Sequence, residues 1–383
     1  MSRFSREGVL SNEPEKVLKD EIALALSGGG FRATLFHLGT LRRLNELGVL
    51  ARLGRISCVS GGSVIGGVLA KAWAPLVKAG WSQAAFDEHV SDPVRAFCGR
   101  NVDAWAIGEG ALLPGTTAAN VVTREYRNQL FGNFSLQDLP ANVEFVFNAT
   151  NLQTGRLIRF TRHHVRDYSV GSIERPELEL ATVVAASSAF PPFLSPLTID
   201  APGRFEPLEG AIHSGDPEYT EQLHLTDGGV YDNLGLEPVW KASRTVLVSD
   251  AGAPFQLVGE VETDWVRQTL RALDVATDQA RGLRKRWLVD RYVRGELAGC
   301  YWGIDTDIGD YPVAAALPCD PATVGPLASI RTRLNAFDDT EQGQLANWGY
   351  VLCDTAIAGH AAHLVPAGAS KAAWPYPSQA LGA

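Results

Sequence analysis

The sequence lacks any run of 18 or more apolar residues, and residues 1–21 are polar and charged. A membrane-spanning helix needs about 20 consecutive apolar residues, and a secretory signal needs an apolar stretch near its start. The five cysteines are scattered and form no CxxC pair, which argues against a disulfide framework or a zinc site. We therefore expect a cytoplasmic protein that uses neither a metal ion nor a cofactor.

An excess of basic residues is also lacking: 34 Lys and Arg stand against 43 Asp and Glu, for a net charge of −9. Binding to a phosphate backbone needs a basic footprint, so nucleic acid is not expected as a partner. Neither an internal repeat nor a long Pro/Ser/Gly linker divides the chain. We expect an N-terminal extension at 1–20, one domain at 21–365 and a flexible tail at 366–383.

Two successive strand–turn–helix units are present near the start of the chain. Residues 22–27 form an apolar strand pattern that ends in glycines, and leucines then recur every third residue between 35 and 47. A second strand at 56–59 precedes a turn and a helix pattern at 64–78. This order predicts an α/β fold with a largely parallel sheet.

Further elements follow along the chain. A strand pair is predicted at 143–149 and 156–161, another buried strand at 245–249, and one long helix at 266–294. Residues 91–120 are rich in Gly and Pro and predict a loop or cap.

The first glycine turn contains Gly28, Gly29 and Gly30, followed by Arg32. Three glycines between a strand and a helix leave backbone N–H groups free to converge on an anion, as an oxyanion hole requires. A Walker A loop would end in Gly-Lys-Ser/Thr, which is absent. Ala33 stands where a dinucleotide fingerprint has its last glycine, which disfavours a nucleotide site.

The second glycine turn holds two serines that could act as nucleophiles. In a G-x-S-x-G elbow the serine lies on a tight turn between a strand and a helix. Gly61 precedes Ser63 by two residues, although Ile65 replaces the second glycine. Ser60 has Gly62 two residues later, but Cys58 occupies its preceding glycine position. We therefore predict Ser63 as the nucleophile and keep Ser60 as its rival.

Two further pieces follow in the chain: a small-residue block at 185–192 that ends in two prolines, and the turn Asp227-Gly228-Gly229. With the two glycine turns, in this order, they resemble the patatin-like phospholipases, whose motifs would span residues 26–250. The resemblance implies a three-layer α/β/α fold with a central, largely parallel sheet. It also implies a Ser63–Asp227 dyad that cleaves fatty acyl esters of phospholipids through an acyl-enzyme. In that scheme Gly28, Gly29, Gly30 and Arg32 would form the oxyanion site.

Two other functions remain open. An α/β-hydrolase triad needs Ser, Asp and His in that order, and His360 and His363 follow both Asp227 and Asp250. The fold could also serve as a lipid-binding module without turnover.

The region at 260–365 carries no diagnostic motif. Six basic residues between 281 and 294 alternate with apolar and aromatic ones. This pattern suits a peripheral membrane surface, or a long helix that packs its apolar stripe and keeps its basic face solvated or paired with acidic residues. If a small-molecule activator gates the enzyme, its site is expected after residue 260. Asp305, Asp307 and Asp310 lack the glycine and closing glutamate of a calcium loop.

Overall fold

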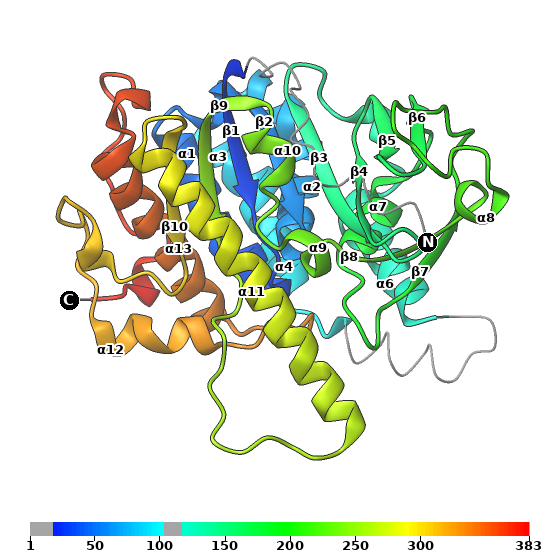
Figure 1. Cartoon of the computed structure of the whole chain (residues 1–383). Helices are drawn as coiled ribbons and strands as arrows, with labels where there is room; N and C mark the ends of the chain where they lie inside the picture. Colours follow the sequence, from blue (N-terminus) through cyan, green and yellow to red (C-terminus); the bar gives the residue numbers. More distant parts are fainter. Residues whose placement is uncertain (1–17, 103–116, 383) are drawn as a thin grey trace.

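The computed structural model describes residues 18–102 and 117–382, and within them one mixed sheet of ten strands forms the centre of the molecule (Figure 1). Its main order is β10-β9-β1-β2-β3-β4-β5-β6. The first five strands in that order run parallel, and the last three continue antiparallel from β3. β8 pairs with β3 and β7. The strands are β1 Lys19–Leu26, β2 Leu53–Val59, β3 Glu144–Asn151, β4 Arg156–Phe160, β5 His164–Asp167, β6 Gly171–Glu174, β7 Leu197–Asp200, β8 Gln222–Asp227, β9 Ser243–Asp250 and β10 Ala298–Gly303.

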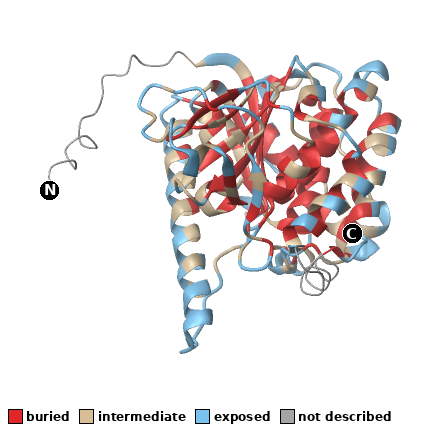
Figure 2. Cartoon of the chain, turned by 90° about the vertical axis from the view of Figure 1, so that its right-hand side faces the viewer, coloured by how far each residue is buried: buried red, intermediate tan, exposed pale blue. Residues whose placement is uncertain are grey.

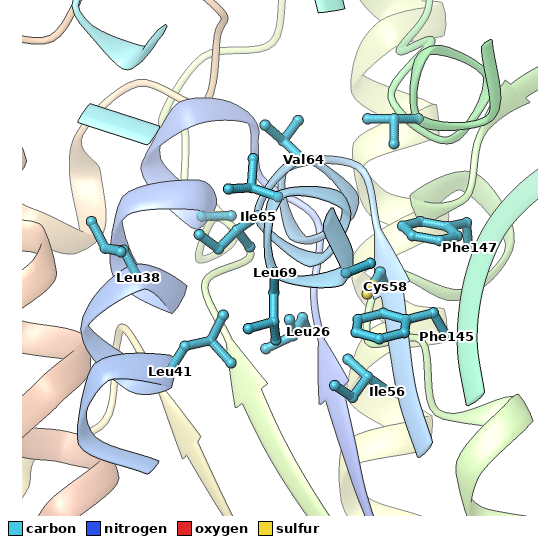
Figure 3. Close-up of a cluster of buried hydrophobic side chains, with 14 of the residues drawn as sticks. Leu26, Leu38, Leu41, Ile56, Cys58, Val64, Ile65, Leu69, Phe145 and Phe147 are labelled. Carbon is cyan, nitrogen blue, oxygen red and sulfur yellow. The ribbon is translucent and has the colours of Figure 1, made fainter. Parts of the chain in front are cut away.

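Helices cover both faces of the sheet, as the alternation of side chains in β1 demonstrates. Ile22, Leu24 and Leu26 enter a large core with the helices of one face (Figure 3), whereas Ala23 and Ala25 enter a smaller core with those of the other. The three-layer α/β/α class is thereby confirmed. The first face carries α1 Gly30–Glu46, α2 Gly61–Lys78, α3 Gln83–Phe86, α4 Asp92–Cys98, α6 Ala118–Tyr126, α7 Leu180–Ser187 and α13 Asp339–His360; the second carries α9 Gly229–Asp232, α10 Glu237–Trp240 and α11 Trp265–Val293; α8 Pro217–Thr220 and α12 Pro321–Val324 are short connections.

The predicted long helix and the strand pair are present, as α11 and as β3 with β4. Helix α13 was not identified from the sequence. It packs against α1 so closely that a Cβ on Gly39 would lie 1.7 Å from the Ala346 carbonyl oxygen, and one on Gly349 would lie 1.9 Å from that of Phe36. Both glycines are therefore required where the two helices cross.

A loose tail is expected for 366–383, but within the described part of this segment, residues 366–382, the chain is bonded to α13. The Asn347 side-chain amide on α13 donates to the Tyr376 carbonyl and the Gln379 carbonyl, both at 2.9 Å, and the Ala373 amide donates to the Tyr350 hydroxyl at 3.2 Å. Composition suggested a flexible tail, but these bonds hold the segment on α13. Most of the predicted N-terminal extension, and residues 103–116 of the predicted cap, lie outside the described residues.

Burial is concentrated in the sheet and in the helices on its first face, whereas the first half of α11 projects from the body with exposed side chains (Figure 2). Among the described helices, none combines the length and apolar character needed to cross a bilayer.

Candidate active site

The turn between β2 and α2 places Ser60 in a strained backbone conformation. Its φ is 51° and its ψ is −119°, a region that non-glycine residues rarely adopt outside functional sites. The following glycines permit the turn because Cβ atoms on Gly61 and Gly62 would lie 2.1 Å from the Gly30 carbonyl oxygen and 2.4 Å from that of Leu26. This is the geometry of a nucleophile elbow, with the serine between a strand end and a helix N-terminus.

The sheet register brings Asp227 to this elbow. The last residue of β2, Val59, pairs with Asn148 of β3, and the last residue of β8, Asp227, pairs with the next residue of β3, Ala149. The ends of β2 and β8 therefore meet on β3. As a result, Ser60 and the Asp227 carboxylate line the same cavity, and the Ser60 side chain is close enough to lower the pKa of Asp227.

Asp227 is almost fully buried, and this determines its proton affinity. Burial raises the pKa of Asp227 to about 6, although hydrogen bonds with the Ser60 side chain and the Gly229 amide lower it in part. The Gly229 amide donates to Oδ1 at 2.7 Å. A carboxylate with this pKa is largely ionised at neutral pH and is a stronger base than an exposed aspartate.

The glycine loop supplies backbone donors beside Ser60. The Gly28 amide donates to the Asn233 carbonyl at 3.0 Å and is therefore not free for a ligand. The amides of Gly29 and Gly30, in contrast, have no hydrogen-bond acceptor within the described part of the chain. Their φ values of 142° and 56° are accessible mainly to glycine, which explains why two glycines occur here.

A cavity of about 530 Å³ opens over these groups. Its floor is Ser60, Asp227 and the glycine loop, and much of its wall is apolar. The lining residues outside the floor include Ser188, Phe190, Pro191, Pro192, Phe193, Leu194, Phe255, Arg271, Thr277, Arg281, Thr332 and Leu334. A pocket with an apolar wall and a few convergent polar groups suits a ligand with a long apolar chain.

Ser63 does not take part in this arrangement, contrary to the predicted Ser63–Asp227 pair. It lies in the first turn of α2 with no exposed surface, and its Oγ is 2.7 Å from Ser187 Oγ. Ser187 Oγ accepts from the Ser60 amide at 3.0 Å and donates to the Asn148 carbonyl at 2.6 Å. Ser63 thus supports the elbow from behind, and the geometry argues for Ser60 as the serine that faces Asp227.

The sequence disfavoured Ser60 because Cys58 stands where an elbow has its first glycine. The structure explains how a larger side chain fits there. A Cβ on Gly66 would lie 2.4 Å from Cys58 Sγ, so the missing side chain of Gly66 leaves the space that Cys58 fills (Figure 3 shows Cys58 in this core). The larger residue, Cys58, lies on β2, and the smaller one, Gly66, lies on α2. Spacing along the sequence could not reveal that these two residues compensate each other in size.

Arg32 does not point into the cavity, although the resemblance placed it at the oxyanion site. Its buried guanidinium donates to the carbonyls of Ala328 and Ile330 at 2.8 Å and to that of Ala251 at 2.7 Å. These bonds fix the chain just before Thr332, which lines the cavity. Arg32 therefore positions the cavity wall.

The wall also depends on an ion pair that the sequence did not reveal. Arg281 of α11 contacts Asp250, at the end of β9, with Nη2 at 2.7 Å from Oδ2, and both side chains are nearly buried. Burial alone would raise the pKa of Asp250, but Arg281 lowers it below its usual range. The Tyr301 hydroxyl donates to the same oxygen at 2.8 Å. Asp250 is thus engaged in anchoring α11.

The histidines offer no triad. Of the described residues that line the cavity, none is histidine. His360 and His363 are exposed at the end of α13. His37 is buried in α1 between Ser249 Oγ at 2.8 Å and the Ser27 carbonyl at 3.0 Å, and burial lowers its pKa to about 4. Asp227 is therefore the ionisable side chain beside Ser60 on the cavity floor.

The basic side chains of the segment 281–294 mainly contact other residues of this protein. Besides Arg281, Arg284 lies 3.4 Å from Asp232, and Lys285 lies 4.4 Å from the centre of the Tyr301 ring.

No cluster of possible metal ligands occurs among the described residues, Asp305, Asp307 and Asp310 included.

Comparison with solved structures finds the same fold in human GIVD cytosolic phospholipase A2. In complex with methyl gamma-linolenyl fluorophosphonate, that protein matches with a TM-score of 0.50 and 14% identity, covering 88% of this chain and 57% of the other. Another structure of the human protein gives a TM-score of 0.47 and 13% identity, covering 88% and 61%. VipD from Legionella pneumophila gives 0.36 and 12%, covering 89% and 67%. The chain therefore spans about three fifths of the length of the human protein.

Sequence comparison with curated proteins gives no significant match. A family model for patatin-like phospholipases, however, matches residues 24–240. This range contains both glycine turns, the small-residue block and Asp227, and it covers more than half of the chain. The chain therefore belongs to the patatin-like phospholipase family.

Proposed function

We propose that this protein is a lipid acyl hydrolase in which Ser60 and Asp227 form the catalytic dyad. The observation that carries the proposal is the elbow serine beside a buried aspartate on the floor of a cavity with an apolar wall. Family membership supports the reaction class. The predicted dyad is thus revised in its serine and kept in its aspartate.

The chemistry follows from these positions. Asp227 accepts the proton of Ser60 Oγ as this oxygen attacks the ester carbonyl carbon. The amides of Gly29 and Gly30 stabilise the resulting oxyanion, and one such donor contributes about 3 kcal/mol in other hydrolases. The alcohol leaves with the proton from Asp227. Water then attacks the acyl-enzyme and gives its proton to Asp227. As the bond between the acyl carbon and Ser60 Oγ breaks, Asp227 returns this proton to Oγ, and the fatty acid departs.

We propose phospholipids as the substrate class. The cavity wall accepts an acyl chain through Phe190, Phe193 and Leu194, and it carries charged side chains such as Arg271 toward the α11 side. The human structure of the same fold was solved in complex with methyl gamma-linolenyl fluorophosphonate, whose linolenyl group is a long hydrocarbon chain.

The proposal is tested by assaying the purified protein on a soluble p-nitrophenyl ester and on phosphatidylcholine, beside a His360→Ala/His363→Ala variant. We expect hydrolysis of both esters, and a double variant within about twofold of the original, because neither histidine lines the cavity. Loss of activity in a folded double variant would support the triad. Lipid binding without turnover of either ester would support the non-catalytic module.

We further propose that the enzyme contacts its lipid surface through residues 254–275, here called the projecting hairpin, instead of through 281–294. The hairpin leads from the cavity rim at Phe255 into the free half of α11 (Figures 1 and 2). Leu257 is 90% exposed, Trp265 79% and, on the facing rim, Phe193 64%. Apolar groups around the mouth of a lipid pocket are suited to enter a bilayer, where tryptophan favours the interface.

The charge of the projecting hairpin indicates which lipids it contacts. It contains four carboxylates and two arginines, Arg267 and Arg271. Arg267 pairs with Glu262 at 3.0 Å, and Arg271 lies over the Phe255 ring at 4.1 Å from its centre. With this negative balance, contact through apolar side chains favours zwitterionic over anionic membranes.

A Leu257→Ser/Trp265→Ser variant tests this contact. We expect hydrolysis of phosphatidylcholine vesicles, and binding to them, to fall about tenfold or more, since two large apolar side chains no longer enter the bilayer. Cleavage of the soluble ester should stay within about twofold. Ile212→Ser provides the matched control, because Ile212 is 76% exposed and does not line the cavity. Equal vesicle activity in both variants would contradict the proposed contact.

A further inference from the structure

A second cavity, of about 510 Å³, lies against the other end of the sheet. It covers parts of β2, β3, β4 and β5 beside α10, and it shares no lining residue with the active-site cavity. Beside α10, these strands present polar side chains to the cavity. The lining residues are Arg55, Glu144, Val146, Leu157, Arg159, Thr161, His164, Arg166, Tyr168, Tyr231, Glu237, Pro238, Lys241 and Ala242.

The cavity is basic in an acidic protein. Three arginines and one lysine line it, against two glutamates, whereas the whole chain carries a net charge of −9. The two glutamates already have partners: Glu144 lies 2.6 Å from Arg55, and Glu237 lies 2.6 Å from Lys241. The positive charge that remains belongs to Arg159 and Arg166.

These two arginines stand directly opposite each other in the sheet. Arg159 of β4 pairs with Arg166 of β5 in the antiparallel register, and both side chains line the cavity. Like charges at directly opposed positions destabilise a sheet. The pair of arginines therefore does not stabilise the fold. An anion bound between the two guanidinium groups is the simplest reason for both arginines to line the cavity.

The surroundings compensate this repulsion only in part, through the charges of Glu237 and Glu144 near Arg159. Arg166 reaches Glu174 only at 3.8 Å, and Arg159 makes no ion pair with any residue that the structure describes. Burial and the neighbouring Arg166 lower the pKa of Arg159. Burial and the same two arginines lower the pKa of His164 to about 4, so this imidazole is neutral and free to donate a hydrogen bond.

We propose that this cavity binds a small anion bearing a phosphate group, held between Arg159 and Arg166. A guanidinium forms paired hydrogen bonds with phosphate oxygens, and two of them match a group of two negative charges. Tyr168 and Tyr231 add aromatic surface for the remainder of the ligand. The phosphate belongs either to a soluble metabolite or to the headgroup of a lipid, which share this chemistry.

The site also touches the catalytic turn. Tyr231 lies in α9, which begins two residues after Asp227, so a ligand against Tyr231 contacts the helix that follows the proposed base. The inference concerns binding, however, and it stands whether or not the proposed hydrolase activity is found.

The test measures thermal unfolding and calorimetric binding of the full chain with inorganic pyrophosphate, against sodium chloride at matched ionic strength. We expect pyrophosphate to raise Tm by about 3 °C or more at saturation. Arg159→Gln should bind at least about tenfold more weakly, and in phosphate-free buffer its Tm should equal or exceed that of the original chain, because the like-charge pair is gone. Arg286→Gln, an exposed arginine outside the cavity, serves as the control.

Each outcome decides the proposal. No Tm response to pyrophosphate beyond that to sodium chloride overturns it, and so does an Arg159→Gln variant that responds like Arg286→Gln. A variant with lower Tm in buffer and an intact response would make Arg159 structural. Water-soluble dihexanoyl phosphatidic acid, added in a separate arm, separates the sources: tighter binding than pyrophosphate assigns the site to a lipid headgroup, and weaker binding assigns it to a soluble phosphate.

Discussion

Replacing Ser60 by alanine is expected to lower kcat/KM for both soluble and lipid esters by at least about a thousandfold, because the attacking oxygen is removed. Ser63→Ala should keep activity within about tenfold. It loses only the bond to Ser187 behind the elbow, which contributes about 1 kcal/mol to stability. The paired measurement therefore distinguishes the serine that the structure favours from the serine that the sequence favoured.

Labelling identifies the nucleophile independently of rates. A long-chain fluorophosphonate should react with Ser60 Oγ, which forms a bond to phosphorus as fluoride leaves. Fragment-ion mass spectrometry of the peptide that contains both serines then locates the added mass. The label should be absent from Ser60→Ala and present in Ser63→Ala. An adduct on Ser63, or an active Ser60→Ala enzyme, would restore the predicted Ser63.

Asp227→Asn is expected to lower kcat by a comparable factor, since the amide cannot accept the proton of Ser60. In the original enzyme kcat/KM should rise with pH through about 6, the pKa to which burial raises Asp227, and fall about tenfold per unit below it. The profile on a soluble ester measures this pKa directly. A profile that is flat between about pH 5 and pH 8 would exclude Asp227 as the base.

Asp227→Asn lowers activity, but it should increase the stability of the folded protein at about pH 8. An aspartate titrates near 3.9 in an unfolded chain and about 6 here, so the folded state binds more protons between these values. The free energy of unfolding therefore falls as pH rises from about 4 to about 6 and stays lower above that. Asp227→Asn should raise Tm at about pH 8, and the gain should disappear near pH 4. An unstable variant would instead indicate a structural role.

Much of the site could be predicted from local sequence. The spacing of apolar residues predicts α1, α2 and α11 to within a few residues, and local motifs indicate the glycine loop and Asp227. These features are local because a glycine that needs a positive φ, such as Gly30, or a short buried strand depends mainly on its immediate neighbours.

The choice between the two serines could not be made in this way. Both lie on one glycine turn, and the motif criterion rejected Ser60 because of Cys58. The decisive facts are the space left by Gly66 and the register that sets Asp227 beside Val59 on β3. Each of these relates residues on different elements.

Residues beyond 260 show the same division more clearly. Helix α13 and the packed segment at 366–382 carry no motif, and they became interpretable only through contacts with α1 and with each other. The basic segment at 281–294 suits either a membrane surface or pairing with acidic residues, and in the structure Arg281 pairs with Asp250. The sequence alone does not indicate whether a basic side chain pairs with a carboxylate or is exposed to solvent.

By itself, then, the sequence determined the first two strand–turn–helix units, the two glycine turns and the family resemblance, because these depend on residues close together in the chain. Only the tertiary structure decided that Ser60 lies beside Asp227, that Arg32 bonds to the segment that forms a wall of the cavity, and that Arg159 lies opposite Arg166 in the sheet. Those relations arise from strand register and packing, which join residues whose separation in the sequence carries no signal.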